Sequence, residues 1–526
     1  LFLYKDSIYT TMKSIKIPLN RLSGLLNIHK RYYLFVCLST LFIALMFTST
    51  DFLTIPVNSF KDVCILFMQW IVVTLSLFFA MLILSVNRYI FLFLMPLLTL
   101  VSAVLAYFRY TINATLTPML LDAALDNDLG TSAQLVSGGL VLFLLAALFL
   151  SAGLIYLRFK LGIVQYKPGL LLTGVAGMLF LTNVSAFQRP ISERIPFNIY
   201  YTVSKYNEEK QSIKQQRISL TEQSKCTDDK PLTVVFVLGE SLRPDHLGLN
   251  GYQRNTTPLL SKEDIISFQN IHTEYTYTNR SLPHILTRAD SLNPDRAFTE
   301  ESFVSLFNSC NYYTVWLANQ ESAKSYAYFM HECDSLFYAN IEKSSYVFDK
   351  WVDESLFPLF DSALKSAADK KLIILHTIGS HWWYNSHYTD SFARYQPVTK
   401  SKIISSCTKE EMINSYDNTV LYTDYFIHSL IGKLRNERAI LVYLSDHGEA
   451  LGEDGIWLHA SQSPATQQTA GMVWMSASYK ADYPQKYEKA MQKRDKKMRT
   501  DFLFHSLLDA GGIDSQYKDY TLSIFR

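Results

Sequence analysis

Two short apolar stretches decide the fold of the second half of this chain: Thr233-Val-Val-Phe-Val-Leu-Gly239 and Ala439-Ile-Leu-Val-Tyr-Leu-Ser445. Each is rich in β-branched and aromatic residues and has the pattern of a buried strand. The first is followed directly by Glu240 and the second by Asp446-His447, which are metal-ligand side chains. Because ligands bind at the carboxyl ends of parallel strands, we expect these side chains to form one site.

Further apolar runs alternate with helical patterns between residues 231 and 526. One helix is predicted to begin after Thr408, whose hydroxyl can cap it and which Glu411 follows three residues later. Strands that alternate with helices predict an α/β domain with a mostly parallel sheet. The additional predicted strands are Tyr313–Leu317, Leu372–His376 and Gly471–Met475.

The first half of the chain is dominated by long apolar segments. With 526 residues and 49% hydrophobic residues, the chain is too long and too apolar for one soluble domain. Buried helices of a soluble protein are the alternative, but Ile71–Ser85 has no polar stripe. Crossing a bilayer takes roughly 20 residues. The predicted membrane spans are Tyr32–Thr48, Val63–Leu84, Tyr89–Tyr107, Leu135–Tyr156 and Pro168–Phe187.

Basic residues in the loops predict the orientation of these spans. The leader and the loops on its side carry most of the lysines and arginines of the first half, so the leader is expected to face the cytoplasm. Five crossings then place everything after Phe187 on the opposite side. The predicted divisions are a leader over 1–31 (with 1–11 not native), membrane helices over 32–187, a linker over 188–230, and a catalytic domain over 231–526. Within the linker, Ile195–Tyr206 is amphipathic and is expected to lie on the bilayer.

Charge and cysteines set further bounds. The net charge of +2 argues for no nucleic-acid partner. Outside the apolar runs there are four cysteines, which could form two disulfides in an oxidising compartment, and four unpaired thiols are the alternative. They are Cys226, Cys310, Cys333 and Cys407.

Three histidines stand in contexts that suggest a metal site. His447 follows a strand end, His459 lies twelve residues later, and His381 follows the strand that ends near His376. Carboxylate and imidazole ligands suit zinc, which indicates Glu240, Asp446 and His447 as ligands. Gly448 is expected to permit a sharp turn beside them. A hydrogen-bonded Asp-His pair without a metal is the alternative.

Four motifs carry a resemblance to a known family. They are Gly239-Glu-Ser-Leu-Arg-Pro-Asp-His-Leu-Gly-Leu-Asn-Gly-Tyr-Gln-Arg-Asn-Thr-Thr-Pro258, Tyr277-Thr-Asn-Arg-Ser-Leu-Pro283, Asn414-Ser-Tyr-Asp-Asn-Thr-Val-Leu-Tyr-Thr-Asp424 and Ser445-Asp-His-Gly-Glu-Ala-Leu-Gly-Glu-Asp-Gly-Ile-Trp-Leu-His459. In sequence and order they resemble the motifs of the lipid A phosphoethanolamine transferases, which include the mobile colistin-resistance enzymes. The resemblance implies five N-terminal transmembrane helices and a C-terminal α/β sulfatase-like domain of the alkaline phosphatase superfamily.

The resemblance implies a nucleophile and a ligand set. The family's nucleophilic threonine lies five residues before a proline, and Thr278 stands at that distance from Pro283. Zinc would then be bound by Glu240, Thr278, Asp446 and His447, with one tightly bound ion and a second left open. Ser281 is a rival, since related sulfatases place their nucleophile there. Those sulfatases carry an arginine two residues after the proline, where this chain has Ile285.

Other residues match family positions near the substrate. His381 and His459 match residues that face the phosphoryl group, as catalytic donors. Lys324 matches a substrate-binding lysine, with a solvated lysine as the alternative. Asp122 and Asp126 stand where many members carry Asn and Thr that contact the ethanolamine.

The nucleophile loop departs from the family in one further respect. Many members bracket this loop with a disulfide, and this chain has Glu274 and His284 near those places. We therefore expect the loop to be held by Pro283 and by packing.

The implied activity is transfer of phosphoethanolamine from phosphatidylethanolamine to lipid A or another envelope glycan, through a phospho-threonine. The implied setting is the bacterial inner membrane, with the catalytic domain of a monomer in the periplasm. The added amine would reduce negative surface charge and the binding of cationic peptides such as polymyxin. A phosphoglycerol transferase or phosphodiesterase, and a catalytically inactive membrane protein, are the alternatives.

Overall fold

The structure is a computed structural model that describes residues 19–112, 115–118, 120–121, 125, 137–164, 167–343, 349–459 and 461–526. The chain divides into two compact units. The helical unit comprises Leu1–Thr54, Val63–Ile112 and Asp128–Tyr201, and the sheet unit comprises Ile55–Asp62, Asn113–Asn127 and Thr202–Arg526. The division at Tyr201 falls inside the predicted linker, and the finer predicted boundaries stay predictions.

The helical unit consists of long apolar helices. Within the described residues, four helices are long and apolar enough to cross a bilayer. A bent pair, α9 and α10, brings the number of spans to five if the pair is counted as one. The predicted transmembrane domain is therefore confirmed as four to five apolar helices. The four long helices are α2 (Leu19–Phe47), α4 (Phe60–Val86), α5 (Arg88–Ile112) and α8 (Gly138–Lys160). The bent pair is α9 (Lys167–Asn183) and α10 (Ser185–Ser192), and short α3 (Ser49–Leu53) follows α2.

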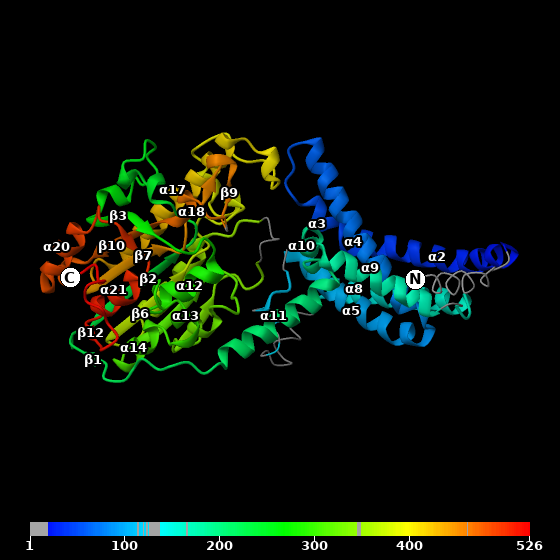
Figure 1. Cartoon of the computed structure of the whole chain (residues 1–526), viewed down its shortest axis with the longest axis horizontal. Coiled ribbons are helices and arrows are strands. Elements are labelled where there is room, and N and C mark those ends of the chain that lie inside the picture. Colours follow the sequence, from blue (N-terminus) through cyan, green and yellow to red (C-terminus); the bar gives the residue numbers. More distant parts are fainter. Residues whose placement is uncertain are drawn as a thin grey trace, which may run out of the picture. The chain divides into compact units, whose positions relative to one another are not determined.

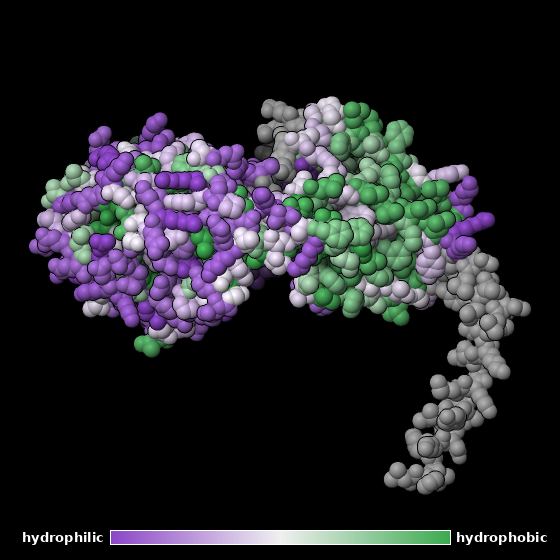
Figure 2. Space-filling view, turned by 90° about the horizontal axis from the view of Figure 1, so that it is seen from above, coloured by the Kyte–Doolittle hydropathy of each residue, from purple (hydrophilic) through white to green (hydrophobic). Residues whose placement is uncertain are grey.

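Hydrophobic side chains cover most of the face of this unit that Figure 2 shows. Phe149 and Leu142, for example, are 78% and 68% exposed. A soluble unit would bury such side chains, so this surface is suited to contact lipid. The linker helix α11 (Phe197–Ile213) covers most of the predicted amphipathic segment and extends beyond it.

An eight-stranded sheet forms the centre of the sheet unit (Figure 1). Seven strands run in one direction, and only β10 is antiparallel to its neighbours. The mostly parallel sheet is thus confirmed, with the predicted strand Gly471–Met475 as its antiparallel member. In spatial order the strands are β11 (Met498–Arg499), β3 (Ile265–His272), β10 (Gln468–Met475), β7 (Ala439–Ser445), β2 (Leu232–Gly239), β6 (Lys370–His376), β4 (Tyr313–Ala318) and β5 (Ser335–Tyr338).

Helices cover both faces of this sheet, so β2 is buried along its whole length. Val234, Phe236 and Leu238 pack into one core with α12 (Thr278–Leu286), α14 (Phe303–Ser309) and α21 (Phe502–Ala510). The alternating residues Val235 and Val237 pack into a second core with α16 (Phe357–Leu364) and α17 (Lys409–Leu434). A strand buried on both faces reads as a continuous apolar run, which is the pattern that predicted it.

Short elements complete the sheet unit. They are α13 (Arg296–Thr299), α15 (Ala327–Met330), α18 (Pro464–Gln467), α19 (Ala477–Asp482), α20 (Pro484–Gln492), the pair β1 (Lys225–Cys226) with β12 (Ile513–Asp514), and the pair β8 (Ala450–Leu451) with β9 (Trp457–Leu458). All six cysteines carry free thiols, so the two expected disulfides are not formed in this structure.

The predicted start of α17 is confirmed in detail. The hydroxyl of Thr408 accepts a hydrogen bond from the backbone N–H of Glu411 at 3.2 Å. The carboxylate of Glu411 in turn accepts one from the N–H of Thr408 at 2.8 Å. This reciprocal capping box satisfies two N–H groups that the first helical turn leaves without intrahelical partners.

Thr408→Ala should therefore destabilise the protein. We expect a loss of about 1 kcal/mol, the usual contribution of an N-cap hydroxyl, which lowers the melting temperature by about 2 °C in a domain of this size. Differential scanning fluorimetry of the purified full chain in detergent measures the shift. Thr408→Ser keeps the hydroxyl and serves as the control, and equal melting temperatures for Ala and Ser would refute the assignment.

Candidate metal centre

The ends of β2 and β7 form the base of the site. The two strands pair in parallel with Gly239 opposite Ser445, so Glu240 and Asp446 follow at the same level of the sheet. The backbone N–H of Asp446 donates to the carbonyl of Gly239 at 3.1 Å. The two sequence-predicted ligand segments, about two hundred residues apart in the chain, are thus brought side by side.

Three predicted ligands meet in a buried cluster. The Nε2 atom of His447 lies 3.4 Å from Oε1 of Glu240 and 3.3 Å from Oδ2 of Asp446. The three residues are no more than 1% exposed. Two carboxylates packed together away from water repel each other unless a positive charge lies between them.

Two polar atoms in this cluster lack hydrogen-bond partners. Oδ1 of Asp446 accepts backbone N–H bonds from Ser241 at 3.2 Å and from His447 at 2.8 Å, whereas its Oδ2 has no partner. Nδ1 of His447 donates to the carbonyl of Gly448 at 2.8 Å, which leaves the lone pair of Nε2 in the site, also without a partner. Buried polar atoms are nearly always satisfied, so these two fit the role of metal ligands.

The glycine after His447 is required for packing. A Cβ atom on Gly448 would lie 2.1 Å from the carbonyl oxygen of Ala465 and 2.3 Å from that of Gln468. Its backbone does not adopt a positive φ, so the expected sharp turn is not the reason for glycine here. The close approach of the chain before β10 is the reason, and it fixes the loop that carries His447.

Thr278 reaches the cluster from the start of α12. Its hydroxyl donates to Oε2 of Glu240 at 3.0 Å. The rival Ser281 donates its hydroxyl to the backbone carbonyl of Asp446 at 2.5 Å, which is a structural hydrogen bond. The hydroxyl of Thr278 therefore contacts a side chain of the cluster, whereas that of Ser281 contacts the backbone.

The loop before Thr278 is held by packing and an ion pair. The rings of Tyr275 and His284 lie 4.1 Å apart, and Glu274 pairs with Arg499 at 3.2 Å. Nδ1 of His284 also donates to the backbone carbonyl of Arg280 at 2.8 Å. The contact between Tyr275 and His284 joins the two ends of the loop, and the ion pair of Glu274 ties its first end to β11.

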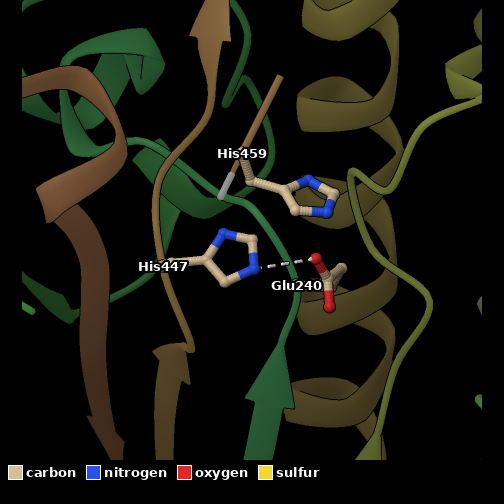
Figure 3. A group of neighbouring side chains, drawn as sticks. All are labelled: Glu240, His447 and His459. Atoms are coloured by element: carbon tan, nitrogen blue, oxygen red, sulfur yellow. Dashed lines mark ion pairs between the residues drawn. The ribbon is translucent and has the colours of Figure 1, made fainter. Parts of the chain in front are cut away.

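His459 points at the same cluster, as Figure 3 shows. Ligand atoms of Glu240, His447 and His459 all lie within 4.8 Å of one another. The ring of His381 lies 5.7 Å from that of His459, between centroids. The structure thus brings together six of the sequence-predicted residues: Glu240, Thr278, Asp446, His447, His381 and His459.

The charges of the cluster shift the pKa values of its two carboxyls in opposite directions. Burial raises the pKa of Glu240, but the imidazoles of His447, His381 and His459 outweigh burial and hold that pKa well below its usual range. Burial and the neighbouring charge of Glu240 raise the pKa of Asp446. Opposite shifts are expected where two carboxyls are buried side by side and interact strongly.

Two residues of the site, Glu449 and Gln320, were not predicted from the sequence. Glu449 is fully buried and accepts hydrogen bonds from the hydroxyl of Tyr384 at 2.6 Å and from Nδ1 of His459 at 3.2 Å. Burial lowers the pKa of His459, but the hydrogen bond and charge of Glu449 outweigh burial and raise it to about 9. Glu449 lies two residues after His447 in the motif Ser445–His459, so its place beside a predicted ligand could have identified it.

The second is Gln320, which follows strand β4. Its amide donates to Oε2 of Glu240 at 3.1 Å and to the carbonyl of Thr377 at 2.7 Å. The strand-end argument that identified Glu240 applies equally to this position, because β4 runs parallel to β6 and β2.

Of the three predicted substrate-binding residues, the structure describes Lys324, and no contact among the described residues brings it to the cluster. Lys324 has a side chain that is 64% exposed and lies 3.6 Å from the carboxylate of Glu208 on α11. Asp122 and Asp126 lie outside the described residues. Their roles stay predictions.

Comparison with known proteins places this fold. A family model described as Sulfatase matches residues 232–513, more than half of the chain. Phosphoethanolamine transferase EptA of Salmonella typhimurium is 32% identical over 55% of this chain and 55% of its own length. Kdo(2)-lipid A phosphoethanolamine 7''-transferase of Escherichia coli is 36% identical over 47% of this chain and 45% of its own length. The chain thus spans about half the length of these curated relatives.

Solved structures agree with both parts of the architecture. The integral membrane lipooligosaccharide phosphoethanolamine transferase A of Neisseria meningitidis matches 93% of this chain and 98% of its own, with 25% identity and a TM-score of 0.54. The C-terminal periplasmic domain of EcEptC from Escherichia coli in complex with Zn matches 59% of this chain and 90% of its own, with 27% identity and a TM-score of 0.54. By the match over its sheet unit, this chain belongs to the sulfatase family.

Proposed function

We propose that this protein is a zinc-dependent enzyme that transfers phosphoethanolamine from phosphatidylethanolamine to lipid A or another envelope glycan. One observation carries the proposal: a threonine hydroxyl lies against a buried carboxylate beside two buried atoms, Asp446 Oδ2 and His447 Nε2, that have no hydrogen-bond partner. The names of the relatives and the zinc complex of a similar domain support the choice of group and metal.

Four residues would hold the zinc: Glu240, Thr278, Asp446 and His447. Two carboxylates, one imidazole and one hydroxyl make a donor set that zinc accepts, and both orphaned atoms are then satisfied. When bound, the ion lowers the pKa of the hydroxyl and offsets negative charge on the phosphoryl oxygens. His459 lies close enough to the same cluster to contact a phosphoryl oxygen there.

Thr278 acts as the nucleophile. Its hydroxyl is directed by the hydrogen bond to Glu240, and its oxygen attacks the phosphorus of the donor phosphodiester. A bond from phosphorus to Thr278 forms as the bond to the diacylglycerol oxygen breaks. An acceptor hydroxyl oxygen then attacks the same phosphorus while its proton passes to His459, which gave its own proton to the diacylglycerol oxygen. The bond from phosphorus to Thr278 breaks, the deprotonated oxygen of Thr278 is released, and both residues return to their starting states.

His459 supplies a proton in this sequence. Since Nδ1 of His459 is bound to the carboxylate of Glu449, a proton on Nε2 is available to the departing alkoxide. Glu449 fixes the tautomer and the orientation of that ring, and Tyr384 holds Glu449 in place. His381, whose pKa is lowered by burial, is expected to be neutral and to donate a hydrogen bond to a phosphoryl oxygen.

The membrane setting follows from the proposal. The apolar helices would sit in the bacterial inner membrane with the leader in the cytoplasm and the sheet unit in the periplasm. The donor lipid would then come from the outer leaflet of that membrane. Lys324 would contact the substrate only after leaving Glu208, and Asp122 and Asp126 would hold the ammonium of the ethanolamine.

Thr278→Ala should lower the rate of transfer by roughly a thousandfold or more, because the atom that forms the covalent bond is removed. Mass spectrometry of lipid A and envelope glycans from cells that express each variant measures the phosphoethanolamine adduct. Ser281→Ala is the matched control and should cost less than about tenfold, the effect of one lost structural hydrogen bond. The reverse ranking would make Ser281 the nucleophile. A phosphoglycerol adduct would instead reassign the substrate.

Removal of zinc should reduce both stability and activity. At a free zinc concentration a thousand times its Kd, binding stabilises the folded state by about 4 kcal/mol, and a chelator removes that stabilisation. We expect dialysis against EDTA to lower the melting temperature and abolish transfer, and added zinc to restore both. Asp446→Asn should contain less zinc by elemental analysis and show a smaller EDTA shift. An EDTA-treated protein that is zinc-free, unshifted and active would contradict the metal centre.

Glu449→Gln should lower kcat by about 10- to 100-fold, the usual cost of losing a residue that orients a catalytic imidazole. Zinc content should stay the same, because Glu449 is not among the proposed ligands. Tyr384→Phe removes only the other hydrogen bond to Glu449 and should have a smaller effect. If Glu449→Gln instead lost zinc and kept the kcat of its zinc-loaded fraction, its role would be structural.

A further inference from the structure

The turn that carries His381 lies directly against Glu240. The turn comprises residues 377–381, which follow β6. The backbone N–H of Ser380 donates to the carbonyl of Glu240 at 3.0 Å. Gly379 adopts a φ of +50°, and a Cβ atom on it would lie 2.9 Å from the carbonyl oxygen of Glu240. A shift of this turn would therefore move His381 relative to the metal centre.

The carboxylate of Asp353 holds the backbone of the turn. Its Oδ1 accepts a hydrogen bond from the N–H of Ile378 at 2.8 Å, and its Oδ2 accepts one from the N–H of Gly379 at 3.0 Å. Asp353 begins η4 (Asp353–Leu356) and is buried. Burial raises the pKa of Asp353 to about 6, so at neutral pH the carboxylate is mostly ionised and both oxygens can accept.

Two consecutive residues after β4 complete the support. The side-chain amide of Asn319 donates to Oδ1 of Asp353 at 2.8 Å, and its backbone N–H donates to the carbonyl of His376 at 2.8 Å. The next residue, Gln320, donates to the carbonyl of Thr377 at 2.7 Å. Side chains from three segments far apart in the sequence thus fix one short turn.

A fixed turn matters because of what His381 is expected to do. Its ring lies 5.7 Å from that of His459, between centroids. A donor stabilises a phosphoryl oxygen only at hydrogen-bond distance, and a misplacement of about 1 Å can cost about a hundredfold in rate. If the N–H groups of Ile378 and Gly379 lost their acceptor, the turn would lose the contacts that set its position.

We propose that Asp353 is a positioning residue of the transfer reaction, because its carboxylate fixes the turn 377–381 and so aims the imidazole of His381 at the phosphoryl group. This inference rests on the proposed function, which assigns that role to His381. Among the described residues, no hydrogen bond or ion pair joins Asp353 to a proposed zinc ligand. Asp353 therefore acts through the turn and not through the metal.

The test is a double-mutant cycle on the purified full chain in detergent, with transfer from phosphatidylethanolamine to lipid A followed by mass spectrometry. Asp353→Asn keeps the size of the side chain but replaces one acceptor oxygen with an NH2 group, which cannot accept from a backbone N–H. We expect Asp353→Asn to lower kcat by about tenfold or more in the native background. In the His381→Ala background it should lower kcat by less than about twofold, because the group that it positions is already gone. The KM for the donor lipid and the zinc content should not change.

Asp424 provides a matched control. It is buried, its carboxylate accepts backbone N–H bonds from Leu259 at 3.0 Å and Leu260 at 2.8 Å, and burial raises its pKa to about 6. Asp424→Asn should lower the melting temperature about as much as Asp353→Asn does, but it should keep kcat in both backgrounds. Hydrogen exchange of the peptide that contains residues 377–381 should become faster in Asp353→Asn and stay the same in Asp424→Asn.

Three results would overturn the inference: an equal loss of kcat from Asp353→Asn in both backgrounds, an equal loss from Asp424→Asn, or loss of zinc from Asp353→Asn. If Asp353→Asn does not fold, Asn319→Ala takes its place, with the same pattern expected at a smaller size. Unchanged hydrogen exchange of the turn would also contradict the inference, whether or not the protein transfers phosphoethanolamine. A native chain that transfers none would count against the proposed function alone.

Discussion

The parallel pairing of β2 with β7 is the constraint on which the site depends. With Gly239 opposite Ser445, the chain leaves both strands at one level and Glu240 meets Asp446 and His447. A slip of one residue would turn every side chain of β2 to the other core. The register is held because Val234 and Phe236 fit one core while Val235 and Val237 fit the other. Packing of the apolar strands therefore fixes the chemistry at their ends.

The cluster at those strand ends is costly for the apo protein. Two carboxylates and an imidazole are buried together, and one atom on each of Asp446 and His447 is left without a partner. A desolvated, unsatisfied group costs about 1–3 kcal/mol, and the pKa shifts of Glu240 and Asp446 show how strongly the charges interact. Such an arrangement lowers stability unless a cation occupies it. We infer that this buried cluster is present because of its function and not because it stabilises the fold.

Much of the fold and of the candidate metal centre could be predicted from the sequence, because the strongest signals in the sequence are local. The continuous apolar runs gave β2 and β7, the residues after them gave the ligands, and Thr408 with Glu411 gave the start of α17. What the sequence did not predict depended on tertiary contacts. The direction of β10 depends on how the chain returns from Gly448, and the glycine itself is required by Ala465 and Gln468.

The remaining residues show two further limits of sequence reasoning. Glu449 and Gln320 carry signals of the same kind as the predicted ligands, but a hydrogen bond to His459 or to Glu240 is visible only in three dimensions. Lys324 illustrates the reverse case, since a match in sequence did not bring its side chain to the cluster.

The most direct test of this account is X-ray diffraction from crystals of the zinc-loaded protein at the zinc absorption edge. The anomalous difference map should show its strongest peak in contact with Glu240, Thr278, Asp446 and His447. Strong peaks that lie only elsewhere, in a protein that retains activity, would show that these side chains meet for another reason.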